Sequence, residues 1–546
     1  MVRNVGVRCA LEKINRVIMF AQKHSPRLAR AVFILLLLMY WALSLEDLTV
    51  LPLVYEDEPW QASTGWKLAA QGIFGSDLFE GYHRMEQRYY GFLPLHPFAL
   101  ALTFRAAGVG LFQARFESVA CGLVILALTW SLAQRVYRDA RIGLLAIFVL
   151  LFVRGFMVSA LHPTGILFLD AVRVSRYDVL PPLFGLLALH CYLNAARKNL
   201  QHWYFIAGLC AALAGFAHLY GAFFFIVLLV LMMWNRPPRL LRALGVTGLG
   251  FFSPWLFYAA YVMQDMSAWR AQTRGYGERF ELWNLRWYLE NMRTEVSRYS
   301  VGYLHRGELF PRPGFWILIS SLSASVYALL ERAALQADRR ARVVVTPLVL
   351  LPVLLALLVH VKFTNYLFVV APFAAIAVGW IFVRIWEFLG ASTLRVPARA
   401  LLVGLLMLVF VESAFQMIRR DQVAQTTTPY PALISRLEQF VPEGSRVAGL
   451  HTYALGWEQR EYRALIVPFL LANATLEESP QTLTKGLNAQ KADYILLDAR
   501  LRQFLQTTDA STRAEFERWM RSKHANKIAQ VNDSSYGLFE IYQLNP

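Results

Sequence analysis

The first residues able to do chemistry are three consecutive acids, Glu56, Asp57 and Glu58, followed at once by Pro59. They come directly after a long apolar stretch, which predicts a position where hydrocarbon gives way to water. A carboxylate there can accept a proton from a hydroxyl group during a transfer reaction. Because acids and proline also favour the first turn of a helix, simple capping of a helix that starts here is the competing interpretation.

Cations stand beside acidic or phenolic residues at the ends of later apolar stretches. Arg176 and Asp178 flank Tyr177, and Lys362 precedes Tyr366 in the run Lys-Phe-Thr-Asn-Tyr. An arginine fork and a lysine ammonium both suit phosphate, so Arg176 and Lys362 are candidate phosphate ligands. The simpler interpretations are pairing of Arg176 with Asp178 and extension of Lys362 toward the membrane surface.

The segment after the three acids is unusually ionic for a stretch beside the membrane, with His83, Arg84, Glu86 and Arg88 close together. We expect Arg84 and Arg88 to add phosphate contacts, and His83 and Glu86 to contact a sugar or an acceptor. His218 joins the second group, although a single histidine at an interface is more often structural.

The composition places these residues in a membrane protein. Apolar residues make up 57% of the 546 positions, which is too many for a soluble chain of this length. The formal net charge of +17 does not indicate nucleic-acid binding, because the basic residues are scattered in short clusters. No two of the four cysteines lie in a segment that looks exported, so we expect no disulfide.

Apolar segments long enough to cross roughly 30 Å of hydrocarbon predict about eleven transmembrane helices. They cover residues 31–54, 116–136, 142–161, 179–196, 203–219, 222–234, 243–263, 315–330, 343–361, 366–383 and 400–417. Clusters of Lys and Arg recur after every second span, as is typical of loops on the cytoplasmic side. The N-terminus is then cytoplasmic and the C-terminus extracytoplasmic, or periplasmic.

This alternation also limits residues 93–109, which a hydropathy window alone would count as a span. A crossing here would move every later basic cluster to the other side, so we predict a juxtamembrane or re-entrant helix at the outer face. Under the same topology, the ionisable residues of the spans lie near their outer ends; these are Glu117, Arg154, Asp178, His218, Lys362 and Glu412. The pattern favours a site at the outer face.

The sequence predicts two domains. Residues 1–418 form a transmembrane catalytic domain with outer loops at 55–92 and 265–313. Residues 419–546 form a small α/β domain outside the membrane, with helices near 430–440 and 511–523, strands near 446–450 and 494–497, and a closing hairpin around 532–537.

The candidate residues suit inverting transfer of a sugar from a lipid phosphate. A phosphate leaves without being protonated, so one carboxylate is enough to take the acceptor proton, while cations stabilise the departing phosphate. We expect no cofactor and no all-protein metal site, although carboxylates such as Asp57 and Asp178 could share a divalent metal.

Residues 32–383 resemble the GT-C glycosyltransferases through the acids after the first span, Arg176-Tyr-Asp178, and Lys362-x-x-x-Tyr366 before Pro372. The most similar groups are the dolichyl-phosphate-mannose protein mannosyltransferases and the lipid A aminoarabinose transferases. The resemblance implies a polyprenyl-monophosphate donor and an inverting hexosyl or pentosyl transfer at the non-cytoplasmic face of the cell inner membrane. The acceptor would be a glycan, a lipid or a protein.

By the same resemblance, Asp57 is the catalytic base with Glu58 beside it, and Asp178 is a second carboxylate of the site. Lys362 and Tyr366 match the element that meets the carrier phosphate. The chain departs from the aminoarabinose type at 86–90, which reads Glu-Gln-Arg-Tyr-Tyr where Glu-Lys-Pro-Pro is expected, so the identities of sugar and acceptor do not transfer.

Two other functions fit parts of the pattern. A lipid or solute transporter or scramblase would explain the many spans. However, the sequence shows no inverted repeat, and transport alone does not explain the run Glu56-Asp57-Glu58. A GT-C enzyme with a pyrophosphate-linked oligosaccharide donor is the second alternative, and dependence on a divalent metal would favour it.

Overall fold

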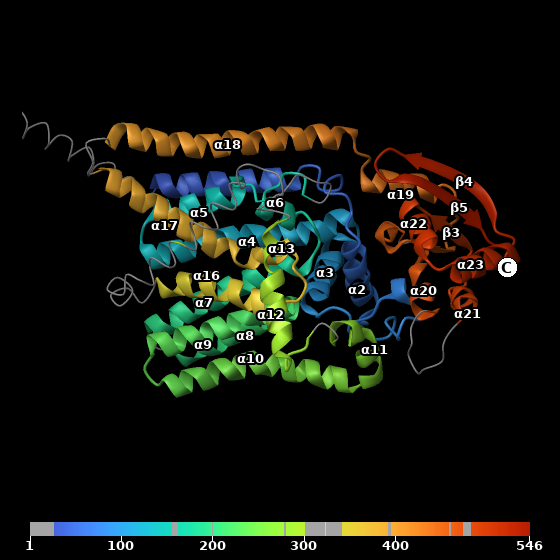
Figure 1. Ribbon diagram of the computed structural model, residues 1–546, viewed down its shortest axis with the longest axis horizontal. Coiled ribbons are helices and arrows are strands. Elements are labelled where there is room, and N and C mark those ends of the chain that lie inside the picture. The colour runs from blue at the N-terminus through green and yellow to red at the C-terminus, as the bar shows by residue number, and fades with distance from the viewer. Residues whose placement is uncertain are drawn as a thin grey trace, which may run out of the picture.

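Long helices lie side by side in one body, and a sheet with its helices lies beyond one end of them (Figure 1). The computed structural model describes residues 27–155, 162–198, 200–277, 280–300, 323, 341–390, 395–457, 460–472 and 482–545. The candidate site residues come from the segments between the helix bundle and the sheet.

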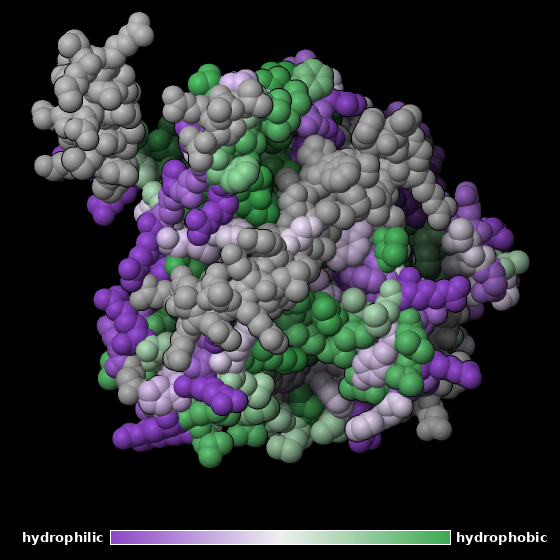
Figure 2. All heavy atoms as spheres, turned by 60° about the vertical axis from the view of Figure 1, so that its left-hand side comes forward, coloured by the Kyte–Doolittle hydropathy of each residue, from purple (hydrophilic) through white to green (hydrophobic). Residues whose placement is uncertain are grey.

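Six helices in the described part of the chain are long and apolar enough to cross a membrane. They are the first helix Arg27–Leu45, α4 (Leu111–Tyr137), α7 (Leu180–Lys198) with the turn before it, α10 (Leu240–Met263), α17 (Ala371–Gly390) and α18 (Arg395–Thr426). Four shorter helices lie among them: α5 (Ala140–Phe152), α8 (Gln201–Ala217), α9 (Phe223–Asn235) and α16 (Arg342–Leu358). Exposed apolar side chains gather on the flank of the bundle, coloured green in Figure 2. The chain is therefore a helical membrane protein, as predicted.

The count of eleven spans stays a prediction, because all of the expected span 315–330 except residue 323 lies outside the described residues. Two expected spans differ from the helices observed. Within the span predicted over 142–161, α5 ends at Phe152 and the backbone is extended at Val153, while residues 156–161 lie outside the described residues. The span predicted to start at 366 begins as a 3₁₀ turn, η4 (Thr364–Val369), and α17 starts at Ala371, where Pro372 suits the first helical turn.

The first outer loop contains α2 (Asp57–Gln71), η1 (Asp77–Phe79) and α3 (Leu95–Ala107). Residues 93–109 thus form one short helix of 13 residues, which at about 1.5 Å per residue is too short to cross the bilayer. It packs against α2 at Gly65, where an added Cβ would lie 2.7 Å from the Leu100 Cβ. The prediction of a helix that does not span is consistent with this length.

Two buried arginines bind the C-terminal end of the first long helix and tie it to the last one. Arg173, just after α6 (Leu167–Val172), donates to the Leu43 carbonyl at 2.7 Å. Arg420 of α18 donates to the same carbonyl at 3.0 Å and pairs with Glu46. Carbonyls at a helix C-terminus lack partners within the helix, so these two cations fix where the first helix ends.

The C-terminal domain has a five-stranded sheet in the order β2-β1-β3-β5-β4. The strands are β1 (Arg446–Gly449), β2 (Glu461–Ala464), β3 (Tyr494–Leu497), β4 (Asn526–Asp533) and β5 (Gly537–Gln543). β1 pairs in parallel with β2 and β3, while β5 is antiparallel to β3 and β4. Its helices are α19 (Tyr430–Glu438), α20 (Ile466–Ala472), α21 (Leu483–Ala489), α22 (Ala499–Thr507) and α23 (Ala510–Ser522). The predicted helices, strands and hairpin of this domain are confirmed.

The C-terminal domain and the first outer loop share one hydrophobic core. Trp60 of α2 lies 4.7 Å from Phe79 and 6.1 Å from His451 between ring centroids. Buried residues of α19 and β1 belong to the same cluster as Ala62 and Tyr89. The loop that carries the acids is therefore held from two sides, by the helix bundle and by the C-terminal domain.

Candidate active site

Asp57, Arg176 and Asp178 form one ionic group where α2 begins. The Arg176 Nη2 lies 3.6 Å from Asp57 Oδ2, and its Nε lies 3.0 Å from Asp178 Oδ2. Arg176 and Asp178 are almost fully buried, whereas 20% of the Asp57 side chain stays exposed. Asp57 is thus the one of the three that has open access for a substrate.

Aromatic rings surround the Arg176 guanidinium. Its Cζ lies 5.0 Å from the centroid of Tyr55, 5.3 Å from that of Tyr177 and 5.1 Å from that of Phe363. Cation–π contacts of this kind stabilise a guanidinium away from bulk water, where its field on a nearby anion is stronger. The arginine is therefore fixed in position while its charge stays available to a ligand.

The surroundings of Asp57 oppose its ionisation. Burial raises the pKa of Asp57 to about 6, against the effect of Arg176, and the neighbouring acids Glu56, Asp178 and Glu58 add to the rise. A carboxylate whose pKa lies near the working pH is both ionised and able to hold a proton, as a general base requires. The Glu56 backbone caps α2 with no hydrogen bond from its side chain, and Arg176 is the side chain that pairs with Asp57.

A ring cluster of Tyr177, His218, Tyr220 and Tyr366, with the rings tilted against one another, continues from this ionic group. The Tyr220 hydroxyl donates to Asp178 Oδ1 at 2.8 Å, and the His218 ring lies 4.8 Å from Tyr177 and 4.2 Å from Tyr220. Tyr366 of η4 lies 4.9 Å from Tyr220 and 5.4 Å from His218. His218 and Tyr366 thus join the acids, as the sequence predicted for residues of one site.

Glu58 points away from Asp57 into a buried network. Its two carboxylate oxygens accept from Arg115 Nε and Nη2 at 2.8 Å each, from the Ser175 backbone N–H at 2.8 Å and from the Tyr55 backbone N–H at 2.9 Å. The side chain is fully buried. With every oxygen engaged, Glu58 joins α2, α4 and the segment before η2 at the point where Asp57 and Arg176 meet.

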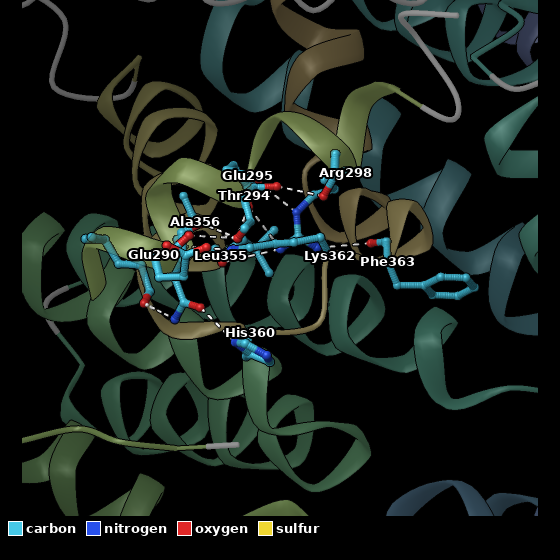
Figure 3. Close-up of polar contacts among 12 residues, drawn as sticks. Glu290, Thr294, Glu295, Arg298, Leu355, Ala356, His360, Lys362 and Phe363 are labelled. Carbon is cyan, nitrogen blue, oxygen red and sulfur yellow. Dashed lines mark hydrogen bonds and ion pairs between the residues drawn. The ribbon is translucent and has the colours of Figure 1, made fainter. Parts of the chain in front are cut away.

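Lys362 lies in a second buried ionic group, beside Tyr366. Its Nζ pairs with Glu295 Oε2 at 3.0 Å and donates to the Ala356 carbonyl at 3.0 Å (Figure 3). Glu295 separates two short helices, α12 (Leu285–Thr294) and α13 (Val296–Ser300), and also accepts from Arg298 at 2.7 and 3.2 Å. Burial lowers the pKa of Lys362, against the effect of Glu295. The Arg298 Cζ lies 5.8 Å from the Tyr366 ring centroid, so this ionic group adjoins the ring cluster.

The ionic stretch after α2 contacts the residues just after α10 and its own neighbours. Arg84 pairs with Asp265 at 3.3 Å, and Arg88 donates to Gln264 at 2.6 Å, where α10 passes into α11 (Met266–Gly277). The centroid of the His83 ring lies 4.4 Å from that of Tyr82, with the two rings tilted by 50°. The Glu86 carboxylate accepts from the Gly81 backbone N–H at 3.1 Å. In the described structure, these contacts of the four residues do not involve Asp57 or Arg176.

Several residues of the site were not identified from the sequence. Glu295 and Arg298 lie in a polar stretch that gives no motif, and Phe363 looks like an ordinary apolar residue. Tyr55 directly precedes the acid run, and an aromatic residue so close to a boundary was the signal that could have drawn attention to it.

The described residues contain no group of three or more His, Cys, Asp or Glu side chains placed to hold a metal ion. Of the carboxylates considered as shared metal ligands, Asp57 and Asp178 are separated by the Arg176 guanidinium. The Arg176 guanidinium thus lies where a metal ion shared by these two carboxylates would have to bind.

The structure is similar to two solved membrane enzymes. ArnT from Cupriavidus metallidurans bound to undecaprenyl phosphate matches with a TM-score of 0.54 and 14% identity over 94% of this chain and 97% of that chain. The oligosaccharyltransferase AglB from Archaeoglobus fulgidus, tethered with an acceptor peptide containing the NVT sequon, matches with a TM-score of 0.52 and 12% identity over 97% of this chain and 75% of that chain. AglB in complex with an inhibitory peptide and a dolichol-phosphate gives a TM-score of 0.50 and 12% identity over 88% and 70% of the two chains.

No protein-family model matches the chain, and no curated protein matches it in sequence. The structural likeness nevertheless extends over most of this chain and nearly all of ArnT. ArnT and AglB are both GT-C glycosyltransferases, so the chain has the GT-C fold that its motifs predicted.

Proposed function

We propose that the chain is an inverting glycosyltransferase that moves a sugar from a polyprenyl-monophosphate carrier to an acceptor at the non-cytoplasmic face of the cell inner membrane. The observation that carries the proposal is the pair of Asp57 and Arg176, one partly exposed carboxylate with a raised pKa beside one fixed cation. The GT-C fold, shared with proteins solved with undecaprenyl phosphate and dolichol-phosphate, supports the class of donor.

In the proposed reaction, Asp57 takes the proton from an acceptor hydroxyl as its oxygen attacks the anomeric carbon of the sugar. The bond between that carbon and the phosphate oxygen breaks, and the carrier phosphate leaves with the electron pair. Arg176 stabilises the negative charge that develops on the leaving group. Asp178 orients Arg176 through its 3.0 Å contact, and Glu58 holds the start of α2 in place.

Lys362 and Tyr366 are proposed to meet the carrier phosphate. His218, in the ring cluster beside Tyr366, is proposed to contact the sugar. Arg84, Arg88, His83 and Glu86 are proposed to act further out, where an acceptor or the carrier approaches. The transmembrane catalytic domain is taken as 1–418 and the extracytoplasmic domain as 419–546, although α18 continues as one helix to Thr426.

The test is purified Asp57→Asn protein, assayed for donor binding and for transfer. Asparagine has nearly the same shape but cannot accept the proton, so transfer should fall about a hundred- to ten-thousandfold while donor binding is retained. Glu56→Gln is the matched control. Glu56 is exposed and adjacent to Asp57, and its substitution removes the same charge. Near-normal transfer by Asp57→Asn would remove the base from the mechanism.

The type of donor is tested separately with a polyprenyl-monophosphate sugar and a polyprenyl-pyrophosphate oligosaccharide. The proposal expects transfer from the monophosphate without added divalent metal. Transfer from the pyrophosphate donor alone, abolished by a chelator, would instead support the oligosaccharide alternative.

A further inference from the structure

The Lys362 ammonium is not free in this structure. It lies 3.0 Å from Glu295 Oε2, and the same carboxylate accepts two hydrogen bonds from Arg298. All three side chains are at least 87% buried, with exposures of 7%, 13% and 0%. Two cations share one carboxylate, so the group holds one positive charge in excess inside the protein.

The helix pair that carries Glu295 also presents an apolar face outward. Leu285, Leu289, Met292 and Val296 follow each other at helical spacing and are all exposed, and Trp283 just before them is fully exposed. The opposite face of α12 packs on α16 through Trp287 and Asn291, and Asn291 donates to the Leu357 carbonyl at 3.0 Å. α12 lies across the bundle rather than along it (Figure 1). A short helix with these two faces is typical of one that lies in a lipid leaflet.

We propose that Arg298 and Lys362 form the binding site for the phosphate of the lipid carrier, and that the Glu295 carboxylate occupies this site until the phosphate displaces it. The proposal rests on the proposed function for the class of ligand. Glu295 supplies two oxygens to the same donors that a phosphate monoester would use, and the apolar face beside it meets the isoprenoid chain.

The displacement leaves the cations in place. Arg298 donates to the Phe363 carbonyl at 3.0 Å and to the Leu355 carbonyl at 3.4 Å, and its own carbonyl accepts from Thr364 at 2.7 Å (Figure 3). These bonds do not depend on Glu295. A phosphate that binds here would lie beside Tyr366, with the sugar directed along the ring cluster toward Asp57.

The experiment measures binding of undecaprenyl phosphate to the full-length protein in phosphatidylcholine nanodiscs. Glu295→Gln removes the resident charge with little change of shape, so the carrier no longer competes with it. The apparent affinity for undecaprenyl phosphate should rise about tenfold or more. In the wild-type protein Glu295 occupies the site most of the time, and the apparent affinity is reduced in proportion to the fraction of protein in which the site is open. Glu290→Gln is the matched control, since Glu290 lies on α12, the helix that ends just before Glu295, is exposed and carries the same charge.

A second variant shows whether the gain acts through the proposed cation. In Glu295→Gln with Lys362→Met, the gain in affinity should disappear. Unchanged or weaker binding by Glu295→Gln, or an equal gain in Glu290→Gln, overturns the role of Glu295 and leaves the transfer proposal standing. No binding of undecaprenyl phosphate by the wild-type protein or by any variant overturns the donor class itself, which separates the two failures.

Discussion

Asp57 is a carboxylate whose own neighbourhood opposes its charge, because it is largely buried and lies near three other acids. Arg176 offsets only part of that effect. The same crowding that makes the ionised form costly makes it a stronger base, since a proton is bound more tightly than by an ordinary aspartate. The base strength therefore comes from the position of Asp57 at the head of α2 and not from its residue type.

The pH dependence of transfer should reflect this group. Asp57 must be ionised to act as a base, and its pKa is raised to about 6, so kcat/KM should be level above pH 7 and fall tenfold per unit below about pH 6. The measurement is kcat/KM for the donor from pH 4.5 to 8, with protein that is shown to stay folded over this range. A profile that is level down to pH 5 would contradict the proposed base.

At the level of residues, the sequence predicted the polar members of the site better than its geometry. Asp57, Arg176, Asp178, His218 and Tyr366 were identified and do lie together. Glu58 could not be separated from Asp57, because adjacent residues at the start of a helix point in different directions only once the helix and its neighbours are placed. Glu295 was not identified, because its partner Lys362 is far away in sequence and only the packing of α12 on α16 brings them together.

At the scale of elements, α2 depends on a buried ion pair for its position. Glu58 and Arg115 are both fully buried, and Arg115 also donates to the Leu48 carbonyl at 2.7 Å. A buried pair contributes little net stability against an apolar replacement, but it fixes the orientation of the elements it joins, and removing one partner leaves a buried charge without compensation.

Glu58→Ala should therefore destabilise the protein strongly, by about 3 to 5 kcal/mol. The check is the thermal midpoint and the yield of monodisperse protein in detergent. Glu80→Ala breaks an ion pair with Arg463 in which the Glu80 side chain is 48% exposed, so it serves as the matched control and should cost less than about 1 kcal/mol. Equal effects of the two substitutions would mean that Glu58 has no special part in positioning α2.

The elements most clearly predicted were those with regular apolar patterns. Alternation along β4 and β5 around a turn rich in Asp, Ser and Gly predicted the hairpin, and its turn closes at Asp533 and Gly537 as expected. The sequence predicts a span that starts within the 3₁₀ turn η4, because Tyr366 to Val370 are as apolar as a transmembrane helix. Hydropathy reports burial and not backbone geometry, and here the buried surroundings are protein.

At the scale of the whole molecule, the proposed topology places α2 and the C-terminal domain on one side of the membrane. Single cysteines introduced into a cysteine-free protein test it with an impermeant thiol reagent. Gln71→Cys and Ser511→Cys, both at exposed positions, should react in intact cells. Pro238→Cys, exposed between α9 and α10, should react only after the membrane is permeabilised. Reaction of all three in intact cells, or of Pro238→Cys alone, would refute the assignment of sides.

The architecture was predictable as a class because membrane helices and a small α/β domain each leave a strong compositional signal. The contact between them was not, since it joins His451 to Trp60 and Phe79, which lie hundreds of positions earlier in the chain. No local pattern marks such a contact, and each ring alone looks like an ordinary buried aromatic residue.

The Leu43 carbonyl accepts hydrogen bonds from both Arg173 and Arg420, and this has a consequence for how the protein is made. Arg420 follows Leu43 by 377 residues, which a ribosome adding 5 to 20 residues per second needs roughly 20 to 75 s to produce. Until then the Leu43 carbonyl lacks the hydrogen bond from Arg420, and the core that the following loop shares with the C-terminal domain has not formed. The contacts of the loop that carries Asp57 are therefore completed only late in synthesis, so under the proposed function a copy truncated before Arg420 should be inert toward the lipid carrier.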